Sequence, residues 1–314
     1  MEKTVKKTSG IRNMKAKRLV FYSLLISVPV LHFLIFYVYI NFNSIVMSMQ
    51  KYELSEMNGY VAKFVWFENF VEAWKALTMR TYLFKNSVVF LASDVFIVTP
   101  LALLFSFYMY KQAALSKFFK VMLFMPQLLS GVILGLLYKY VSSDVYLWFA
   151  DKFNVKASDL LSNLDTQLGA MIFFNVFMGF GVNVLLFAGA MIGVNVSLTE
   201  SAELDGANPL QVFYYIVLPL IFSTVATVVI VYVSHLFTNQ ANLYTLLGNG
   251  AGISGTIGYF MYVQTVESSI APPSGTNFVP YPVLSAMGLL LTAFILPVTM
   301  LFRHLMDKYG PSVE

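Results

Sequence analysis

Residues 199–221 read TESAELDGANPLQVFYYIVLPLI and form a polar interruption between two long apolar segments. The segments on either side, about 168–193 and about 213–237, are each long enough to cross a bilayer as a helix, which takes about 20 residues. A simple connection between two helices needs only a few residues. This longer polar stretch therefore predicts an organised element at the membrane surface rather than a plain linker.

Local signals in this stretch predict a helix, a sharp turn and a second helix. Ser197 and Glu200 have the spacing of a capping box, so a first helix is expected from about Leu198 to Asp205. Gly206 can adopt the left-handed backbone that ends a helix. Asn208 followed by Pro209 then predicts a second start, and Pro219 predicts a kink or restart on the way into the next apolar segment.

The composition of the whole chain places it in the membrane. Only 11% of the 314 residues are charged and 58% are hydrophobic, whereas about 25% of a soluble domain is charged. The predicted fold class is an all-α integral membrane protein with six transmembrane helices. The expected spans lie at roughly 19–42, 84–109, 118–141, 168–193, 213–237 and 282–302.

The distribution of Lys and Arg predicts the orientation. Residues 1–18 carry seven of them, and further ones follow the second span and the last span. Because basic residues favour the cytoplasmic side, we expect both termini and the 197–219 loop in the cytoplasm. The expected domains are a basic N-terminus at 1–18, a first span at 19–42, an outer loop at 43–83 with an amphipathic helix, a five-helix core at 84–302 and a cytoplasmic tail at 303–314.

Several classes of site are excluded or disfavoured. The chain has no Cys, so disulfides and thiolate metal sites are excluded, and no His or acidic pair has metal-ligand spacing. No GxxxxGK[ST] motif occurs, so we expect no ATP site, no other cofactor and no catalytic residue in this chain. The net charge of +4 fits anionic lipid headgroups and gives no reason to expect nucleic acid.

Polar side chains inside apolar spans are candidates for a solute pathway, because such groups usually face the interior of a helix bundle. They can also serve as helix–helix hydrogen bonds. The candidates are Asn175, Asn183, Tyr232, Ser234 and Asn239. Asp94 lies near the middle of the second span, and it is either a structural hydrogen-bonding group or a proton-coupling carboxylate.

The 197–219 loop resembles a known motif. Glu200-Ser201-Ala202, Asp205-Gly206-Ala207, Phe213, Ile216 and Leu218-Pro219 are similar to the EAA loop of permease subunits in binding-protein-dependent ABC importers. The family pattern is EAA, two residues, DGA, then F, I and LP at fixed later spacings. Ser201 is the single departure, and it replaces one small residue by another.

The resemblance extends along most of the chain, towards permeases of the maltose, glycerol-phosphate and multiple-sugar type. The segments FVWFENFVEAW, KNSVVF, LLSGVILGLLYKYV and TIGYFMY are each similar to a family segment in the corresponding place. Trp66 stands where Gly is usual, and the common GGP of the last outer loop is Gly-Asn-Gly here. These departures bear on the subfamily and the substrate.

The resemblance implies a type I importer permease in a prokaryotic cell membrane, driven by partners. Those partners are a cytoplasmic ATPase dimer that binds the ATP, a second permease subunit that is a paralogue rather than a copy, and an extracytoplasmic solute-binding protein. Glu200 and Asp205 would contact the ATPase, Ala202 and Ala207 would allow close packing, and Gly206 would set the turn. Leu218 and Pro219 would join the loop to the fifth span.

Two other functional classes stay open from the residues alone. A secondary transporter would use Asp94 as its coupling group and would not need an organised loop. A membrane-embedded enzyme would need acids, His or Ser clustered at one depth, and the sequence shows no such cluster. Within the importers, a carbohydrate is the expected solute, and a non-sugar solute is the alternative because the EAA pattern is shared by importers of many solutes.

Overall fold

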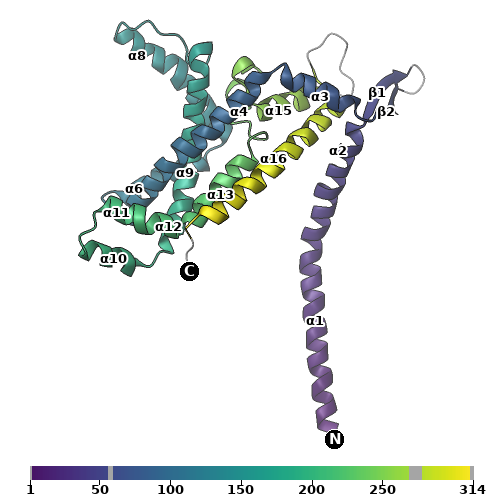
Figure 1. Cartoon of the computed structure of the whole chain (residues 1–314), viewed down its shortest axis with the longest axis vertical. Helices are drawn as coiled ribbons and strands as arrows, with labels where there is room; N and C mark the ends of the chain where they lie inside the picture. Colours follow the sequence, from purple (N-terminus) through teal and green to yellow (C-terminus); the bar gives the residue numbers. More distant parts are fainter. Residues whose placement is uncertain (1, 56–58, 269–277, 312–314) are drawn as a thin grey trace.

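A computed structural model describes the backbone of residues 2–55, 59–268 and 278–311, with side chains for 17–53, 60–268 and 278–311. Most basic residues of the expected 1–18 segment, and the end of the 303–314 tail, lie outside the described side chains. The described residues are almost entirely helical, as the composition predicts, with one antiparallel hairpin (Figure 1). Four helices are long and apolar enough to cross a membrane, or six if each of two bent helix pairs is one span.

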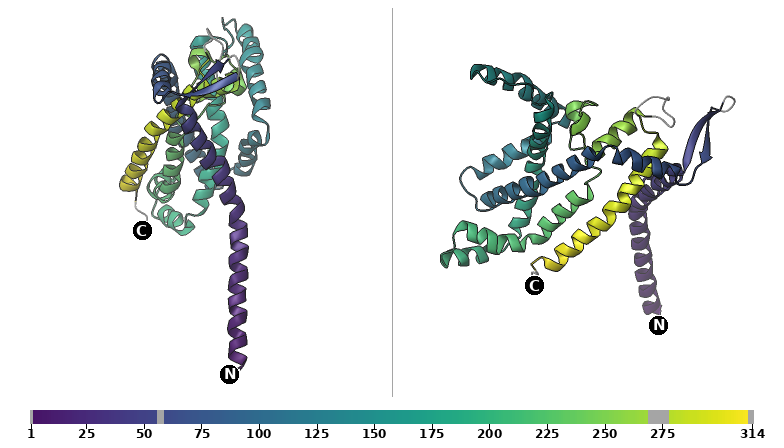
Figure 2. Two further views of the ribbon diagram at one scale, coloured as in Figure 1. Left: turned by 90° about the vertical axis from the view of Figure 1, so that its right-hand side faces the viewer. Right: turned by 45° about the horizontal axis from the view of Figure 1, so that its top comes forward.

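The first span is a continuous helical rod that projects away from the rest of the molecule. It consists of α1 (Glu2–Phe33), a π-helical turn (Leu34–Tyr39) and α2 (Ile40–Ser48). No residue in its most apolar window is buried within the chain, and only α2 approaches the body, where it packs on α16 (Tyr281–Tyr309). Figures 1 and 2 show α1 extending away from the helices that follow α2. Its apolar surface is therefore available to lipid or to another chain.

The segment after the first span forms a hairpin and a surface helix. Strands β1 (Gln50–Ser55) and β2 (Gly59–Phe64) pair with Gln50 opposite Phe64. Asn69, at the start of α3 (Glu68–Thr78), is buried and donates to the carbonyls of Ser48 and Gln50 at 2.8 and 2.7 Å. The expected amphipathic helix is thus present as α3, and its buried Ala73 packs on α16.

The second span is a single helix interrupted by a π-helical turn. It runs through α4 (Thr81–Ser93), the turn Asp94–Val98 and α5 (Thr99–Tyr110). Near its start, buried Asn86 donates to the carbonyls of Ile253 and Gly255, both at 2.9 Å. One side chain of this span therefore fixes the glycine-rich loop that precedes the last two helices.

The third span differs from the expected straight helix at 118–141. It is a pair, α6 (Ser116–Leu128) and α7 (Gly131–Tyr140), bent by 102° and continued by a π-helical turn (Val141–Val145) and α8 (Tyr146–Lys152). Leu129 has extended backbone, and Ser130 caps the new helix by accepting from the Val132 N–H at 3.3 Å. The predicted span contained no bend, although Pro126, Gln127 and the Ser130-Gly131 pair interrupt the apolar run and are the local signals of a break.

The fourth span, α9 (Leu164–Ile192), is a continuous helix against which α5 and α6 pack. Gly181 permits the close approach of α6, because a Cβ atom at this position would lie 2.2 Å from the carbonyl oxygen of Leu123. No side chain larger than hydrogen fits there without moving backbone.

The fifth span follows the polar loop and is bent by 71°. The loop holds α10 (Val196–Leu204), α11 (Pro209–Val212), a π-helical turn (Phe213–Val217) and α12 (Leu218–Leu220), and the span itself is α13 (Phe222–Ser234). The restart expected at Pro219 occurs two residues later, at Ile221. Short helices α14 (Leu243–Leu247) and α15 (Ile257–Glu267) and a 3₁₀ turn (Gly252–Ser254) then lead to α16, which lies beside α13 (Figure 2).

Candidate functional site

The surface loop forms the helix-turn-helix that the sequence predicts, but its cap is different. Asn195 is the N-cap of α10, and its side-chain oxygen accepts from the backbone N–H of Ser197 at 3.1 Å and from the Ser197 hydroxyl at 2.9 Å. The predicted capping box of Ser197 and Glu200 is therefore wrong. The hydroxyl of Ser197 is already committed to Asn195, so Glu200 is released from capping and is exposed.

The turn and the second helix start are as predicted. Gly206 has a φ of +88°, and the Ala207 N–H donates to the Ala202 carbonyl at 2.9 Å across the turn. Asn208 caps α11, and Gln211 completes a reciprocal capping box with distances of 2.9 and 2.8 Å. The role of Gln211 was missed, although its position three residues after the N-cap is the signal that identifies such a box.

The loop has an inner face and an outer face. Thr199 is buried, and Ala202 and Ala207 pack on a core of Phe107, Phe213 and other apolar side chains from α5, α9 and α11. Of the remaining predicted residues, Glu200, Ser201, Asp205 and Gly206 are exposed, while Leu218 and Pro219 are half-buried at the junction with the fifth span. The short helix is thus held by its small residues and presents its acids outward.

One contact of the loop was not predicted. Lys111, at the end of α5, forms an ion pair with Glu203 on α10, and its ammonium lies 5.9 Å from the centre of the Phe107 ring. The ring of Phe107 in turn lies 5.1 Å from that of Phe213. The second span and the surface loop are therefore joined by an ion pair above an aromatic contact. Nothing in the local sequence pairs residues so far apart along the chain.

Three of the five pathway candidates meet in a buried polar cluster. Asn175 donates to the Asp94 carboxylate at 2.8 Å, and the Tyr232 hydroxyl interacts with Asn183 and lies within electrostatic range of Asp94. Asn183 also donates to the Gly179 carbonyl at 2.7 Å. The cluster links the second, fourth and fifth spans. The Asn175–Asp94 bond joins two spans, whereas the Asn183–Gly179 bond lies within α9.

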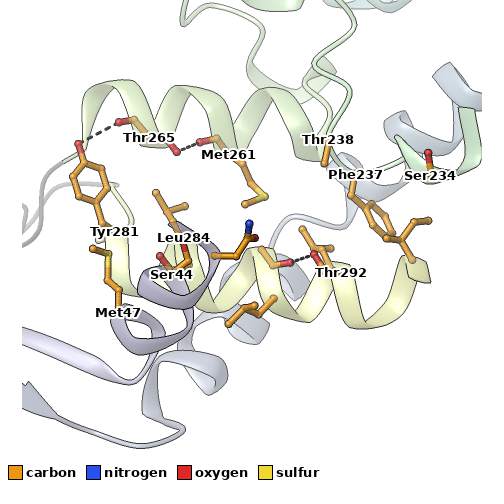
Figure 3. A pocket seen from close by; sticks show the side chains of 16 residues that line it. Ser44, Met47, Ser234, Phe237, Thr238, Met261, Thr265, Tyr281, Leu284 and Thr292 are labelled. Atoms are coloured by element: carbon orange, nitrogen blue, oxygen red, sulfur yellow. Dashed lines mark hydrogen bonds between the residues drawn. The ribbon is translucent and has the colours of Figure 1, made fainter. Parts of the chain in front are cut away.

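Ser234 lies elsewhere, in a pocket of about 460 Å³ between α2, α15, α16 and the end of α13 (Figure 3). The wall combines apolar side chains such as Met261, Phe237 and Leu284 with uncharged polar groups that were not among the predicted site residues. The polar groups are those of Asn41, Ser44, Thr238, Thr265, Tyr281, Ser285 and Thr292. Ser285 and Thr292 recur at helical spacing on one side of α16, which is the signal that could have identified them.

Asn239 belongs to neither group. Its side chain accepts from the Ala241 N–H at 2.8 Å, and its carbonyl accepts from the Thr256 hydroxyl at 3.1 Å. It therefore holds together the loop after the fifth span. Within the described residues, no group of three or more His, Cys, Asp or Glu side chains could hold a metal ion.

Comparison with known proteins gives a consistent set of matches. Residues 98–313 match the family described as binding-protein-dependent transport system inner membrane component. The arabinooligosaccharides transport system permease protein AraP of Bacillus subtilis is 25% identical over 287 residues, covering 89% of this chain and 86% of that protein. The maltose/maltodextrin transport system permease protein MalF of Escherichia coli is 24% identical over 179 residues, covering 55% of this chain and 35% of that protein.

A solved structure shares the fold. A chain of a bacterial ABC transporter involved in the import of the acidic polysaccharide alginate superimposes with a TM-score of 0.75 at 18% identity, covering 95% of this chain and 98% of that chain. The helical fold of this chain is thus shared with a solved ABC importer chain.

Proposed function

The chain belongs to the family of binding-protein-dependent transport system inner membrane components, and on this premise we propose that it forms half of the pathway of an ATP-driven carbohydrate importer. A second permease subunit, a paralogue rather than a copy, supplies the other half. An extracytoplasmic binding protein delivers the solute. The chain itself binds no ATP and has no catalytic residue or cofactor, because the motor is a separate ATPase dimer.

The two faces of α10 carry the coupling role. The carboxylates of Glu200 and Asp205 are exposed and have no hydrogen-bond or ion-pair partner among the described residues, whereas Ala202 and Ala207 are packed inward. An isolated helix of nine residues is marginal in water, and here caps and core packing hold it in place. ATP binding can drive the permease only through contacts that differ between its two states, and this rigid acidic helix provides a surface for them.

In this proposal, docking of the ATPase on α10 defines the orientation of the chain in the membrane. If α10 faces the cytoplasm, both termini are also cytoplasmic, which agrees with the basic residues at 1–18. The hairpin and α3 then lie on the opposite side, where the binding protein docks.

The pocket beside the first span supports a neutral, hydroxyl-rich solute. All of its polar lining groups are uncharged. The hydroxyls of Ser44, Thr265 and Thr292 donate to carbonyls of their own helices at 3.0, 2.8 and 2.8 Å, which leaves their oxygens free to accept. A carbohydrate can donate its hydroxyls to these oxygens and lay its apolar face on Phe237 or Tyr281. A charged solute would find no counter-charge there, which disfavours the non-sugar alternative for ionic solutes.

Co-purification tests the coupling role directly. The solubilised complex is isolated as wild type, Glu200→Ala, Gly206→Pro, and Glu72→Ala as a control acid on the exposed side of α3. We expect wild type and Glu72→Ala to retain an ATPase, and the two loop variants to lose it. Equal retention by all four would overturn docking at α10. Absence of any ATPase from wild type extracted from native membranes would overturn the importer proposal itself.

A further inference from the structure

A second hollow, of about 360 Å³, lies between α3, the start of α4 and the outer half of α16. Its lining is apolar except for two Thr hydroxyls and Arg80, and it includes Trp74, Leu77, Leu291 and Phe294. The rim is open, since Trp74 is 61% and Phe294 55% exposed. The hollow is separate from the coupling loop and from the polar cluster of Asp94, and it shares Phe237 and Leu291 with the pocket beside the first span.

Arg80 is the one charged side chain that lines the hollow, as far as the described residues show. It donates to the Ala76 carbonyl at 3.1 Å, and its guanidinium carbon lies 5.0 Å from the centre of the Phe260 ring. It makes no ion pair with a carboxylate of the described residues. Because a guanidinium has five N–H donors in a planar fork, most of its donors stay open to an anion.

The position of the hollow matches one leaflet of a bilayer. Arg80 directly precedes the second span, which starts at Thr81, so its charge lies at the level of the headgroups. Phe294 is 13 residues into α16, which starts at Tyr281, or about 20 Å along the helix. A hydrocarbon core about 30 Å thick gives each leaflet about 15 Å. The hollow is lined by the first turn of α4, up to Phe84, and by Leu290 to Phe294 of α16, so it opens within one leaflet.

We propose that this hollow binds one phospholipid, with its phosphate on Arg80 and an acyl chain along Leu291 and Phe294. An apolar hollow that opens at this depth has hydrocarbon as its surrounding solvent, and an empty space would forfeit the dispersion contacts of its lining. Phosphate matches the planar donors of Arg in a bidentate geometry. The lipid would contact α3, α4 and α16 together. Among the described residues, no ion pair joins these three helices.

Lipid retention measures this binding. The complex is reconstituted in nanodiscs of equal parts phosphatidylcholine and phosphatidylglycerol. It is then extracted into detergent, and the mass of the protein with its retained lipid is measured by native mass spectrometry. Wild type should keep one phospholipid that Arg80→Gln loses about tenfold more readily, as expected for one charge-assisted contact. Leu290→Trp, which fills the hollow and leaves the charge, should lose it too. Lys85→Gln, an exposed cation outside the lining, should match wild type.

Two results would overturn the proposal. Equal retention by wild type, Arg80→Gln and Leu290→Trp would show that the hollow holds no specific lipid. A photo-crosslinking residue in place of Phe294 should yield a phospholipid adduct, and an adduct with another polypeptide instead would show that a protein partner fills the hollow. Millimolar inorganic phosphate should not displace the lipid. If it did, the site would be a phosphate site without a role for the acyl chain.

Discussion

Asn175 donates a 2.8 Å hydrogen bond to the carboxylate of Asp94 across the interface between the second and fourth spans. Both side chains are buried, with exposed fractions of 8% and 6%. A buried carboxylate needs a partner because its desolvation is costly. The bond therefore explains how a span can carry an acid near its middle, and it gives Asp94 a structural role that a variant can test against a proton-coupling one.

Replacement of Asp94 by Asn tests that distinction. The amide keeps an oxygen that can accept from Asn175, so transport driven by ATP should remain close to wild type. Asn175→Ala leaves the carboxylate without this donor and should destabilise the protein by about 1–3 kcal/mol. Solute uptake and the unfolding free energy in mixed micelles measure the two effects. Loss of uptake in Asp94→Asn with unchanged stability would instead support the secondary transporter.

Charge reversal at Lys111 or Glu203 should act mainly on the coupling of ATP hydrolysis to transport, and only weakly on stability. Their side chains are 26% and 46% exposed, so the pair adds only about 0–1 kcal/mol to stability. Lys111→Glu and Glu203→Lys should each lower solute-stimulated ATP hydrolysis, because like charges then separate α10 from the end of α5. The double variant should recover most of the stimulation. An unrecovered double variant would mean that the pair does not position α10.

Gly181 and Gly189 form a matched test of helix packing on α9. A Cβ atom at Gly181 would lie 2.2 Å from the Leu123 carbonyl oxygen, whereas one at Gly189 meets no atom within 4 Å. Gly181→Ala should therefore cost about 1–3 kcal/mol through overpacking, and Gly189→Ala should be neutral or slightly stabilising. Unfolding free energies of both variants measure the difference, and equal values would contradict the close contact of α6 with α9.

Ser285→Phe tests the pocket beside the first span. The added ring occupies the space that the proposed solute would use, so KM for carbohydrate uptake should rise about tenfold or more. Thr227→Phe places the same ring at an exposed position on α13 outside this pocket and should leave KM unchanged. An equal KM in both variants would remove the pocket from the pathway.

The pathway candidates show where sequence reasoning reached its limit. That Asn175, Asn183 and Tyr232 line a pathway stays a prediction, because spacing along the chain does not distinguish a pathway from a hydrogen-bonded cluster. Periodicity places a side chain on one face of a helix, and only the packing of spans decides what lies opposite that face. Asn41 and Ser44 were missed because the wall that they share with α16 exists only after α2 has folded back onto it.

The sequence by itself determined the membrane class, the six apolar segments and the helix-turn-helix at 197–219, because these depend on composition, on caps and on the conformational freedom of Gly206. The caps made by Ser130 and Asn195 are also local, each to a residue two positions on, and they were missed as local signals rather than hidden by the tertiary structure.

Tertiary structure decided the long-range contacts. The Lys111–Glu203 ion pair and the Asn175–Asp94 hydrogen bond join residues 92 and 81 positions apart. Spacing along the chain does not encode such contacts, because they form only once the spans have packed against one another.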